Sequence, residues 1–202
     1  PPQAKSALKE ALAMGADEAY LISDRAFGGS DTWATSTIIA AAIEKVGKYD
    51  VIFCGRQAID GDTAQVGPEV AEFLGIPQVT YAKEVKVKDD KLLVTRYTET
   101  GDYLIEAKMP VLLTAIKELN NPRYPSVKGI LEAYNNGDAK ITVLTLADLD
   151  VDTTQIGLKG SPTNVYKSFV PVKDKHNEII EGINKKEKAE KLIEILFDLK
   201  LV

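Results

Sequence analysis

Apolar residues recur at alternating helix and strand spacing over the first third of the chain. Helical spacing over residues 3–14 and 32–46 predicts two amphipathic helices. Short apolar runs at 19–22 and 50–54 predict strands, the second buried on both faces. A third helix, ending near Leu74, completes a helix–strand–helix–strand–helix order. This order predicts an α/β fold with a parallel, Rossmann-like sheet and right-handed crossovers.

The pattern changes after Pro77. Four β-rich segments, VTYAKEVKV, KLLVTRYT, YLIEA and MPVLLTAI, are separated by turn residues and predict antiparallel strands added to the parallel core. A short helix around 127–133 and one strand (KITVLTL) follow, within a largely aperiodic stretch at 135–178. An amphipathic helix at 185–199 ends the chain. We expect this helix and the segment before it to form an arm on a partner, or to pack back on the sheet.

The chain opens on Pro1 and Pro2, which lead straight into the first helix. There is no initiator Met, and no segment precedes this helix that could pair with the strand at 19–22. We therefore expect that an N-terminal strand and its loop are missing from this sequence.

Composition excludes several classes of function. The chain has 202 residues, a net charge of −5 and no basic stripe, which argues against nucleic-acid binding. No apolar run is long enough to span a membrane, and no signal-peptide pattern opens the chain. Cys54 is the single cysteine and His176 the single histidine, so we expect neither a disulfide nor a metal site. These features predict a cytoplasmic protein.

The segment DVIFCGRQAIDGDTAQVGPEVAEFLG at 50–75 is the candidate binding site. A buried strand delivers the chain to a loop at its carboxyl end, the usual ligand position in open α/β sheets. Gly55 and Gly61 allow the backbone to turn tightly and to approach a ligand. Asp62 and Gln65 match a capping box, which would aim the amides of residues 63–65 at a pyrophosphate.

Other interpretations of this loop stay open. The helix could begin at Pro68 instead of after Asp62. Asp60 and Asp62 would repel a phosphate unless they point away or contact ribose hydroxyls. Arg56 could clamp a phosphate or be a solvated surface charge. The spacing alone favours nucleotide binding no more than a structural turn.

The loop CGRQAIDGDTAQVGP resembles the adenine-nucleotide-binding loop of electron transfer flavoprotein β subunits. Four other stretches agree in the same order: ALKEALAMGAD, FGGSDTWATS, MPVLLTAIKELNNPRYPSVKGI and VDTTQIGLKGSP. The resemblance therefore covers essentially the whole chain. It implies a nucleotide-binding α/β domain over residues 1–146 and an arm and helix over residues 147–202 that pack on an α subunit. The positions that match the family's loop motif are Gly55, Arg56, Gln57, Ala58, Ile59, Asp60, Asp62, Gln65 and Gly67.

The resemblance implies a heterodimer whose α subunit holds a redox-active FAD. In one branch of the family the β subunit binds structural AMP. In the electron-bifurcating branch it binds a second FAD, which takes hydride from NADH and sends electrons to the α-subunit flavin and to ferredoxin or flavodoxin. Ala64 and Val66 make this loop similar to the bifurcating branch. We expect no catalytic side chain, and oxidoreductase activity only within the complex. The implied cofactor contacts are Gly55, Arg56, Gln57, Ala58, Ile59, Asp60, Gly61, Asp62, Thr63, Ala64, Gln65 and Val66.

The segment NNPRYPSVKGIL at 120–131 resembles the family's recognition loop for acyl-CoA dehydrogenases. The resemblance implies a partner contact through Val127, Lys128 and Ile130, with Val127 as apolar anchor. Alternatively, Val127 and Ile130 are simply the buried face of a short helix.

A competing hypothesis from another class rests on GGSDT, at Gly28–Thr32, which is similar to the phosphate loop of ATP-pyrophosphatases. Such a protein would cleave ATP to activate a substrate. Phe27 stands where that loop has a leading serine, and residues 23–27 separate GGSDT from its strand.

Overall fold

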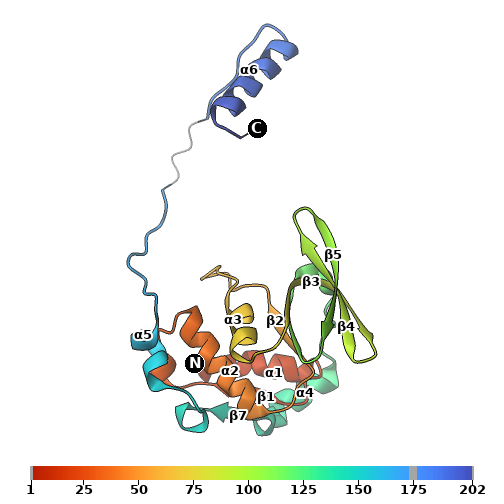
Figure 1. Cartoon of the computed structure of the whole chain (residues 1–202), viewed down its shortest axis with the longest axis vertical. Helices are drawn as coiled ribbons and strands as arrows, with labels where there is room; N and C mark the ends of the chain where they lie inside the picture. The colour runs from red at the N-terminus through yellow and green to blue at the C-terminus, as the bar shows by residue number, and fades with distance from the viewer. Residues whose placement is uncertain (1, 173–176, 202) are drawn as a thin grey trace. The chain divides into compact units, whose positions relative to one another are not determined.

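The computed structural model describes residues 2–172 and 177–201. His176, which we considered as a metal ligand, lies outside this range. The chain forms two compact units, Pro1–Asn164 and Val165–Val202. Figure 1 shows the helices and strands of both units.

The first unit alternates helices and strands over its first half and ends in short helical turns. Its helices are α1 (Lys5–Ala13), α2 (Thr32–Val46), α3 (Val66–Phe73), α4 (Val127–Asn136) and α5 (Gly157–Gly160). Its strands are β1 (Ala19–Ile22), β2 (Val51–Gly55), β3 (Gln78–Lys88), β4 (Lys91–Thr98), β5 (Gly101–Lys108), β6 (Val111–Ala115) and β7 (Ile141–Leu144). The second unit holds α6 (Lys185–Asp198). The predicted helices at 3–14, 32–46 and 185–199 are confirmed.

The strands belong to two sheets, and both contain parallel pairs. β1 pairs with β7 in a parallel, two-stranded sheet. The other sheet has the order β2-β6-β3-β4-β5, with β6 parallel to both β2 and β3. β3, β4 and β5 form an antiparallel meander. The predicted α/β class is therefore confirmed, and three of the four segments predicted as antiparallel strands, β3, β4 and β5, form the meander. The prediction is wrong for the fourth segment, MPVLLTAI, because it forms β6, which runs parallel to both of its neighbours. The prediction of one sheet holding the strands at 19–22 and 50–54 is wrong. β1 pairs with β7 and β2 pairs with β6, and these two pairs belong to different sheets.

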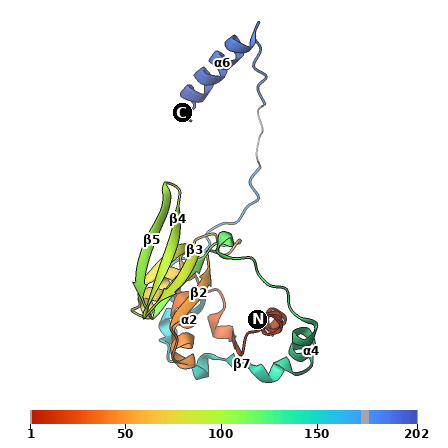
Figure 2. The same ribbon diagram turned by 90° about the vertical axis from the view of Figure 1, so that its right-hand side faces the viewer.

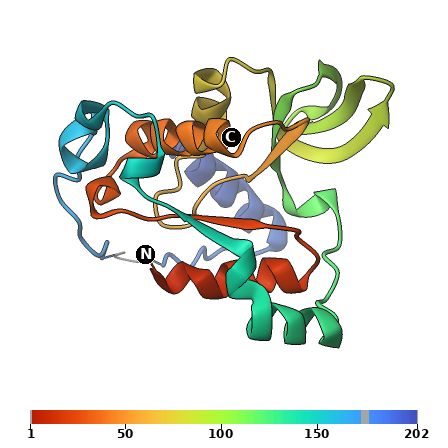
Figure 3. The same cartoon turned by 90° about the horizontal axis from the view of Figure 1, so that it is seen from below.

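Helices cover both faces of the β1–β7 sheet, as Figures 2 and 3 show. Alternate residues of β1 point to opposite faces. Ala19 and Leu21 are buried against α1 and α4, in a cluster with Leu12 and Ala133. Tyr20 and Ile22 pack on the other face, in the cluster that contains Ile38 of α2.

β6 is the most buried strand of the five-stranded sheet. Leu112 packs beneath α3, in a cluster with Val70 and Ala71. Val111 and Leu113 face the other way, into a core made with the antiparallel meander through residues such as Val94. The buried strand β6 thus lies between β2 and β3 and is parallel to both. The candidate site begins at the edge where these strands end.

The first unit extends past residue 146, where we expected the arm to begin. Leu149 and Ile156 are buried in one cluster with Ile38 and Leu144, so apolar packing holds this segment to α2 and β7. The boundary between the two units lies at Asn164 instead.

In the second unit, residues 165–172 and 177–182 have no regular secondary structure, and α6 follows them. Asn184 caps α6, with its side-chain oxygen accepting a hydrogen bond from the Glu187 amide at 3.0 Å. The Glu187 carboxylate in turn accepts one from the Ile183 amide at 2.9 Å. The apolar stripe of α6 remains exposed, with Phe197 at 63%.

Candidate functional site

The loop between β2 and α3 lies at the carboxyl edge of parallel strands. Cys54 and Gly55 of β2 pair with Thr114 and Ala115 of β6, so both strands end at one edge. The chain then runs through residues 56–65 before α3 begins. Open α/β sheets bind ligands in this position.

Side chains within the loop form hydrogen bonds with one another and with the loop backbone. Arg56 Nε donates to Gln57 Oε1 at 2.7 Å, and Gln57 Nε2 donates to Asp62 Oδ1. Asp60 Oδ1 accepts a hydrogen bond from the Gly61 amide at 2.8 Å. The two carboxylates that would repel a phosphate are therefore engaged by donors of the loop itself.

The backbone of the loop is strained at two residues. Asp62 and Ala64 have φ angles of +53° and +54°, in the left-handed region that costs a residue with a Cβ atom about 1–2 kcal/mol. Such residues cluster at ligand sites, where the rest of the fold holds them in place. Two left-handed residues in three positions also prevent the helix from starting before Gln65.

The predicted capping box is therefore wrong. α3 begins at Val66, and Gln65 occupies the N-cap position without a side-chain cap hydrogen bond. Asp62 cannot cap a helix that starts four residues later, and the start at Pro68 is also wrong. The amides of the first turn belong to Val66 and Gly67, because Pro68 has no N–H group. The predicted residues 63–65 precede the helix.

Glycines set how closely α3 and the loop approach their surroundings. A Cβ atom on Gly67 would lie 2.9 Å from Thr114 Cγ2 and 3.4 Å from Cys54 Cβ, so this glycine allows α3 to pack on β6 and β2. Around Gly55 and Gly61 an added Cβ atom would meet no atom within 4 Å. Open space therefore lies beside the two glycines that we expected to approach a ligand.

The predicted cofactor contacts are consecutive residues that form one continuous, largely exposed loop. The Ile59 side chain is fully exposed. Cys54 beneath the loop is half-buried against the α3 cluster, and burial raises the pKa of its thiol. Cys54 therefore remains a neutral packing residue.

Sequence reasoning missed a carboxylate that joins α3 to α2. Glu69 accepts hydrogen bonds from the Ser36 hydroxyl at 2.9 Å and from the Thr32 hydroxyl at 3.2 Å. Ser36 is fully buried. Thr32 and Ser36 lie one helical turn apart on α2, a spacing that could have indicated a shared polar contact. These bonds hold the first turn of α3, and with it the end of the loop.

The polar groups of the GGSDT segment form hydrogen bonds with other residues of the chain. Asp31 caps α2 by accepting from the Ala34 amide at 3.0 Å, and its other oxygen accepts from the Thr163 amide and hydroxyl at 2.9 and 2.8 Å. The Asp31 amide donates to Ser161 Oγ at 2.8 Å, and Ser30 Oγ accepts from the Gly157 amide at 3.0 Å. The groups that a phosphate loop would offer to ATP are thus used within the fold.

Two properties of the described residues bear on the site. Among residues 2–172 and 177–201, none of the helices has the length and apolarity needed to cross a membrane. Within the same residues, no three His, Cys, Asp or Glu side chains are grouped so that they could hold a metal ion.

The fold and the loop define an α/β protein whose candidate site lies at the carboxyl edge of parallel strands. Residues 1–149 match the model of the electron transfer flavoprotein domain. The chain is 59% identical to the electron transfer flavoprotein subunit beta of Thermoanaerobacterium thermosaccharolyticum over 196 residues, which cover 97% of this chain and 74% of the relative. This chain belongs to the electron transfer flavoprotein family.

Two other relatives have names that mention reductases. One is the caffeyl-CoA reductase-Etf complex subunit CarD of Acetobacterium woodii, 51% identical over 96% of this chain and 72% of the relative. The other is the acryloyl-CoA reductase electron transfer subunit gamma of Anaerotignum propionicum, 50% identical over 97% of this chain and 74% of the relative.

Proposed function

We propose that this chain is the β subunit of an electron-bifurcating electron transfer flavoprotein and that its Rossmann-like first unit binds FAD. The adenosine and diphosphate would lie along residues 55–66. The observation behind this proposal is the strained, exposed loop at the carboxyl edge of β2 and β6. With an α subunit, the protein would take electrons from NADH and pass them to a dehydrogenase-type partner and to ferredoxin or flavodoxin.

The residues of the loop fit such a cofactor. Space is open beside Gly55 and Gly61, and Asp60 and Asp62 are turned toward donors of the loop. The amides of Val66 and Gly67 begin α3, where the helix dipole favours an anion. A bound flavin would supply hydride and electron transfer chemistry, while these residues would hold and orient it.

An alternative within the family is a non-bifurcating carrier with structural AMP in the loop. Ala64 and Val66, which are small and apolar, favour the bulkier FAD. Two relatives bear the names of reductase complex subunits, which supports a role beside a CoA-dependent reductase or dehydrogenase.

We also propose that α4 contacts an acyl-CoA dehydrogenase-type flavoprotein. Val127 is 76% exposed, which argues against the alternative that it belongs to the buried face of the helix. Ile130, Leu131 and Tyr134 are exposed at helical spacing from it and extend the apolar stripe. The opposite face of α4 packs on α1, where a Cβ atom on Gly129 would lie 2.3 Å from the Ala13 carbonyl oxygen.

Two further parts of the proposal concern Lys128, the third predicted partner contact, and the second unit. Lys128 lies 3.7 Å from Glu132 in an exposed ion pair, which contributes little energy, so we assign it a secondary role at the interface. The second unit would wrap the α subunit, covering the stripe of Leu192, Ile193 and Phe197 on α6.

Cofactor analysis of the protein co-purified with its α subunit tests this function. We expect two flavins per heterodimer in the visible spectrum. One flavin plus AMP would support the structural-nucleotide carrier, and hydrolysis of ATP to AMP by a colourless protein would support the ATP-pyrophosphatase hypothesis. Gly55→Val would fill the open space and should remove one flavin of the two. Ala139→Val, at an exposed position outside the loop, should retain both.

A further inference from the structure

A pocket opens beside the proposed flavin-binding loop. Its volume is about 840 Å³, within the range of small-molecule pockets. The walls come from β3, β4 and the end of β6, and Arg56 is the one residue of the predicted cofactor loop among those that line it. The proposed function assigns no role to this pocket.

A β-bulge places an aromatic ring in the pocket. The register between β3 and β6 shifts between Val79 and Ala82, and Tyr81 has a φ angle of +57°. Its amide donates to the buried Thr114 hydroxyl at 3.0 Å, which fixes the bulge. A left-handed tyrosine is strained, and bulges near sites commonly re-aim a side chain. The Arg56 guanidinium lies 5.7 Å from the centre of the Tyr81 ring.

A second arginine in the pocket has an unused donor. Among the side chains that the structure describes, Arg96 Nε is the buried nitrogen or oxygen without a hydrogen-bond partner. Leaving a buried charged donor unpaired is costly, and an anion accepting from it would remove that cost. Arginine also offers two parallel N–H groups that match a phosphate or a carboxylate.

The charges of the pocket favour an anion. Lys83 is already paired with Asp102, at 2.7 Å. The other charged residues of the lining are three cations, Arg56, Arg96 and Lys117, and two acidic residues, Glu99 and Glu118, which are both exposed. The partly buried cation is Arg96, whose charge is screened by solvent less than charges at the rim.

We propose that this pocket is a second ligand site, for a small molecule that carries both a phosphate and an aromatic ring. Arg96 and Lys117 bind the phosphate oxygens, and Tyr81 and Tyr97 contact the ring. A carboxylate would offer the same acceptor geometry, so the shared chemistry is an oxyanion on an aromatic ligand. This site is additional to the flavin-binding loop and does not depend on the identity of the cofactor bound there.

Calorimetric titration of the purified heterodimer, with its own flavins bound, tests this site. The probes are ADP, adenosine, inorganic phosphate and succinate. We expect ADP to bind saturably, phosphate more weakly, and adenosine and succinate more weakly still. Absence of saturable ADP binding would overturn the proposal. Tighter binding of succinate than of phosphate would overturn the assignment to a phosphate.

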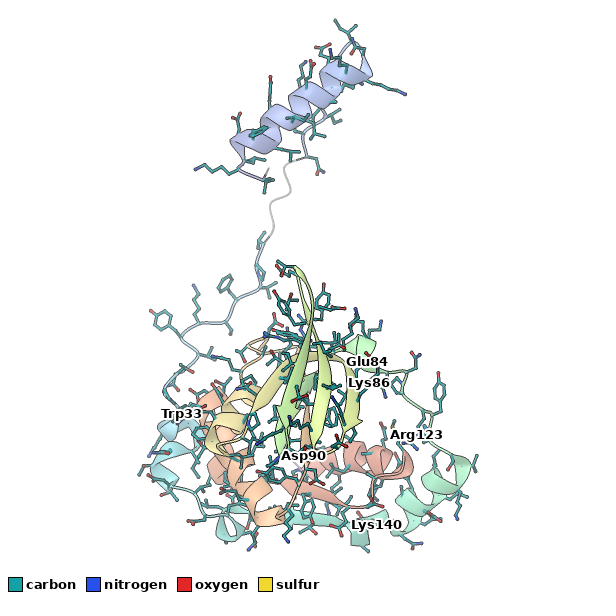
Figure 4. All side chains as sticks on the ribbon, turned by 45° about the vertical axis from the view of Figure 1, so that its right-hand side comes forward. Trp33, Glu84, Lys86, Asp90, Arg123 and Lys140 are labelled. Atoms are coloured by element: carbon teal, nitrogen blue, oxygen red, sulfur yellow. The ribbon has the colours of Figure 1, made fainter. Side chains whose placement is uncertain are left out.

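Variants locate the binding. Arg96→Gln should weaken ADP binding by about tenfold or more, the loss typical of a charged hydrogen bond. Arg123→Gln removes an equal charge from the segment before α4 (Figure 4) and should change binding by less than about twofold. Equal weakening by both variants would show that net charge alone attracts ADP, and would refute the site. Lys117→Gln, at an exposed residue, provides the same test should Arg96→Gln fold poorly.

Two further measurements separate this proposal from the flavin assignment. Tyr81→Ala should reduce ADP binding toward that of phosphate, because the ring contact is lost. The flavin content of each variant, read from its visible spectrum, should stay at the wild-type value for Arg96→Gln and Tyr81→Ala. Loss of flavin together with ADP binding would show that one site holds both, contrary to the proposal.

Discussion

At the scale of single residues, Gly67 links the loop to the core. Its backbone packs so closely on β6 that Thr114 Cγ2 leaves no room for a side chain. The Thr114 hydroxyl is meanwhile held by the Tyr81 amide, so the Thr114 side chain cannot rotate away without losing that hydrogen bond. One glycine and one threonine thus connect the start of α3 to the bulge on β3.

We expect Gly67→Ala to lower the free energy of unfolding by about 1–3 kcal/mol, the usual cost of overpacking a core. The better helix propensity of alanine offsets up to about 1 kcal/mol of the steric cost. Chemical denaturation monitored by circular dichroism measures the change. Gly61→Ala is the matched control, since open space surrounds Gly61, and should stay within about 0.5 kcal/mol of wild type. Equal stability of the two variants would contradict this account.

Residue types predicted the location of the loop better than its conformation. The glycines and the strand before them correctly placed an exposed loop at the end of β2. The left-handed backbone at Asp62 and Ala64 is not visible in the sequence, because neither residue type requires it. The left-handed backbone of Tyr81 is also not visible in the sequence. It follows from the bulge in the pairing of β3 with β6 and from the hydrogen bond of the Tyr81 amide to the Thr114 hydroxyl.

At the scale of elements, the start of α2 is joined to the last residues of the first unit through Asp31. Burial raises the pKa of Asp31, but hydrogen bonds from the Ala34 amide and from Thr163 outweigh this effect and hold the pKa below its ordinary value. A depressed folded-state pKa means that the stabilisation is complete above the pKa of the unfolded chain. It is lost as the pH falls through the lower pKa of the folded protein.

We therefore expect the unfolding free energy to decrease as the pH is lowered below about 4. Asp31→Asn keeps a capping side chain but removes the titrating group, so its stability should depend less steeply on pH in that acid range. Denaturant titrations at a series of pH values measure both slopes. Ser168→Ala, an exposed change in the second unit, serves as control. An unchanged slope in Asp31→Asn would refute the assignment.

Local patterns predicted the elements, but their pairing depends on distant residues. Alternation and turn residues correctly predicted the antiparallel meander, since its strands follow one another in sequence. β1 pairs with β7, which lies more than a hundred residues later, and local periodicity contains no information about such a partner. Periodicity also missed that Leu149 and Ile156 fall in the core of the first unit.

At the scale of the whole molecule, the described surfaces indicate a protein that works in contact with others. The stripe on α4 presents four exposed side chains, those of Val127, Ile130, Leu131 and Tyr134. A face of this size, on a helix whose other side is fixed to α1, suits a transient contact in which a few anchors supply most of the energy.

We expect Val127→Asp to weaken binding to the acyl-CoA dehydrogenase-type partner by about tenfold or more, because a charge would enter an apolar contact. The flavin spectrum of the heterodimer should not change. Surface plasmon resonance with the purified partner measures the affinity. Asn136→Asp places the same charge at an exposed position of α4 that lies away from the stripe by helical periodicity, and should have little effect on binding. Comparable losses in both variants would indicate long-range repulsion instead of an anchor.

The second unit has a thermodynamic consequence of its own. Residues such as Tyr166, Phe169 and Phe197 are exposed in it, and α6 has no buried residue, so this unit gains little stability from an internal core. In the proposed assembly, in which this unit wraps the α subunit, its ordering entropy would be compensated as these side chains leave water. Subunit association in this protein should accordingly show a large negative heat capacity change, and its affinity should vary strongly with temperature.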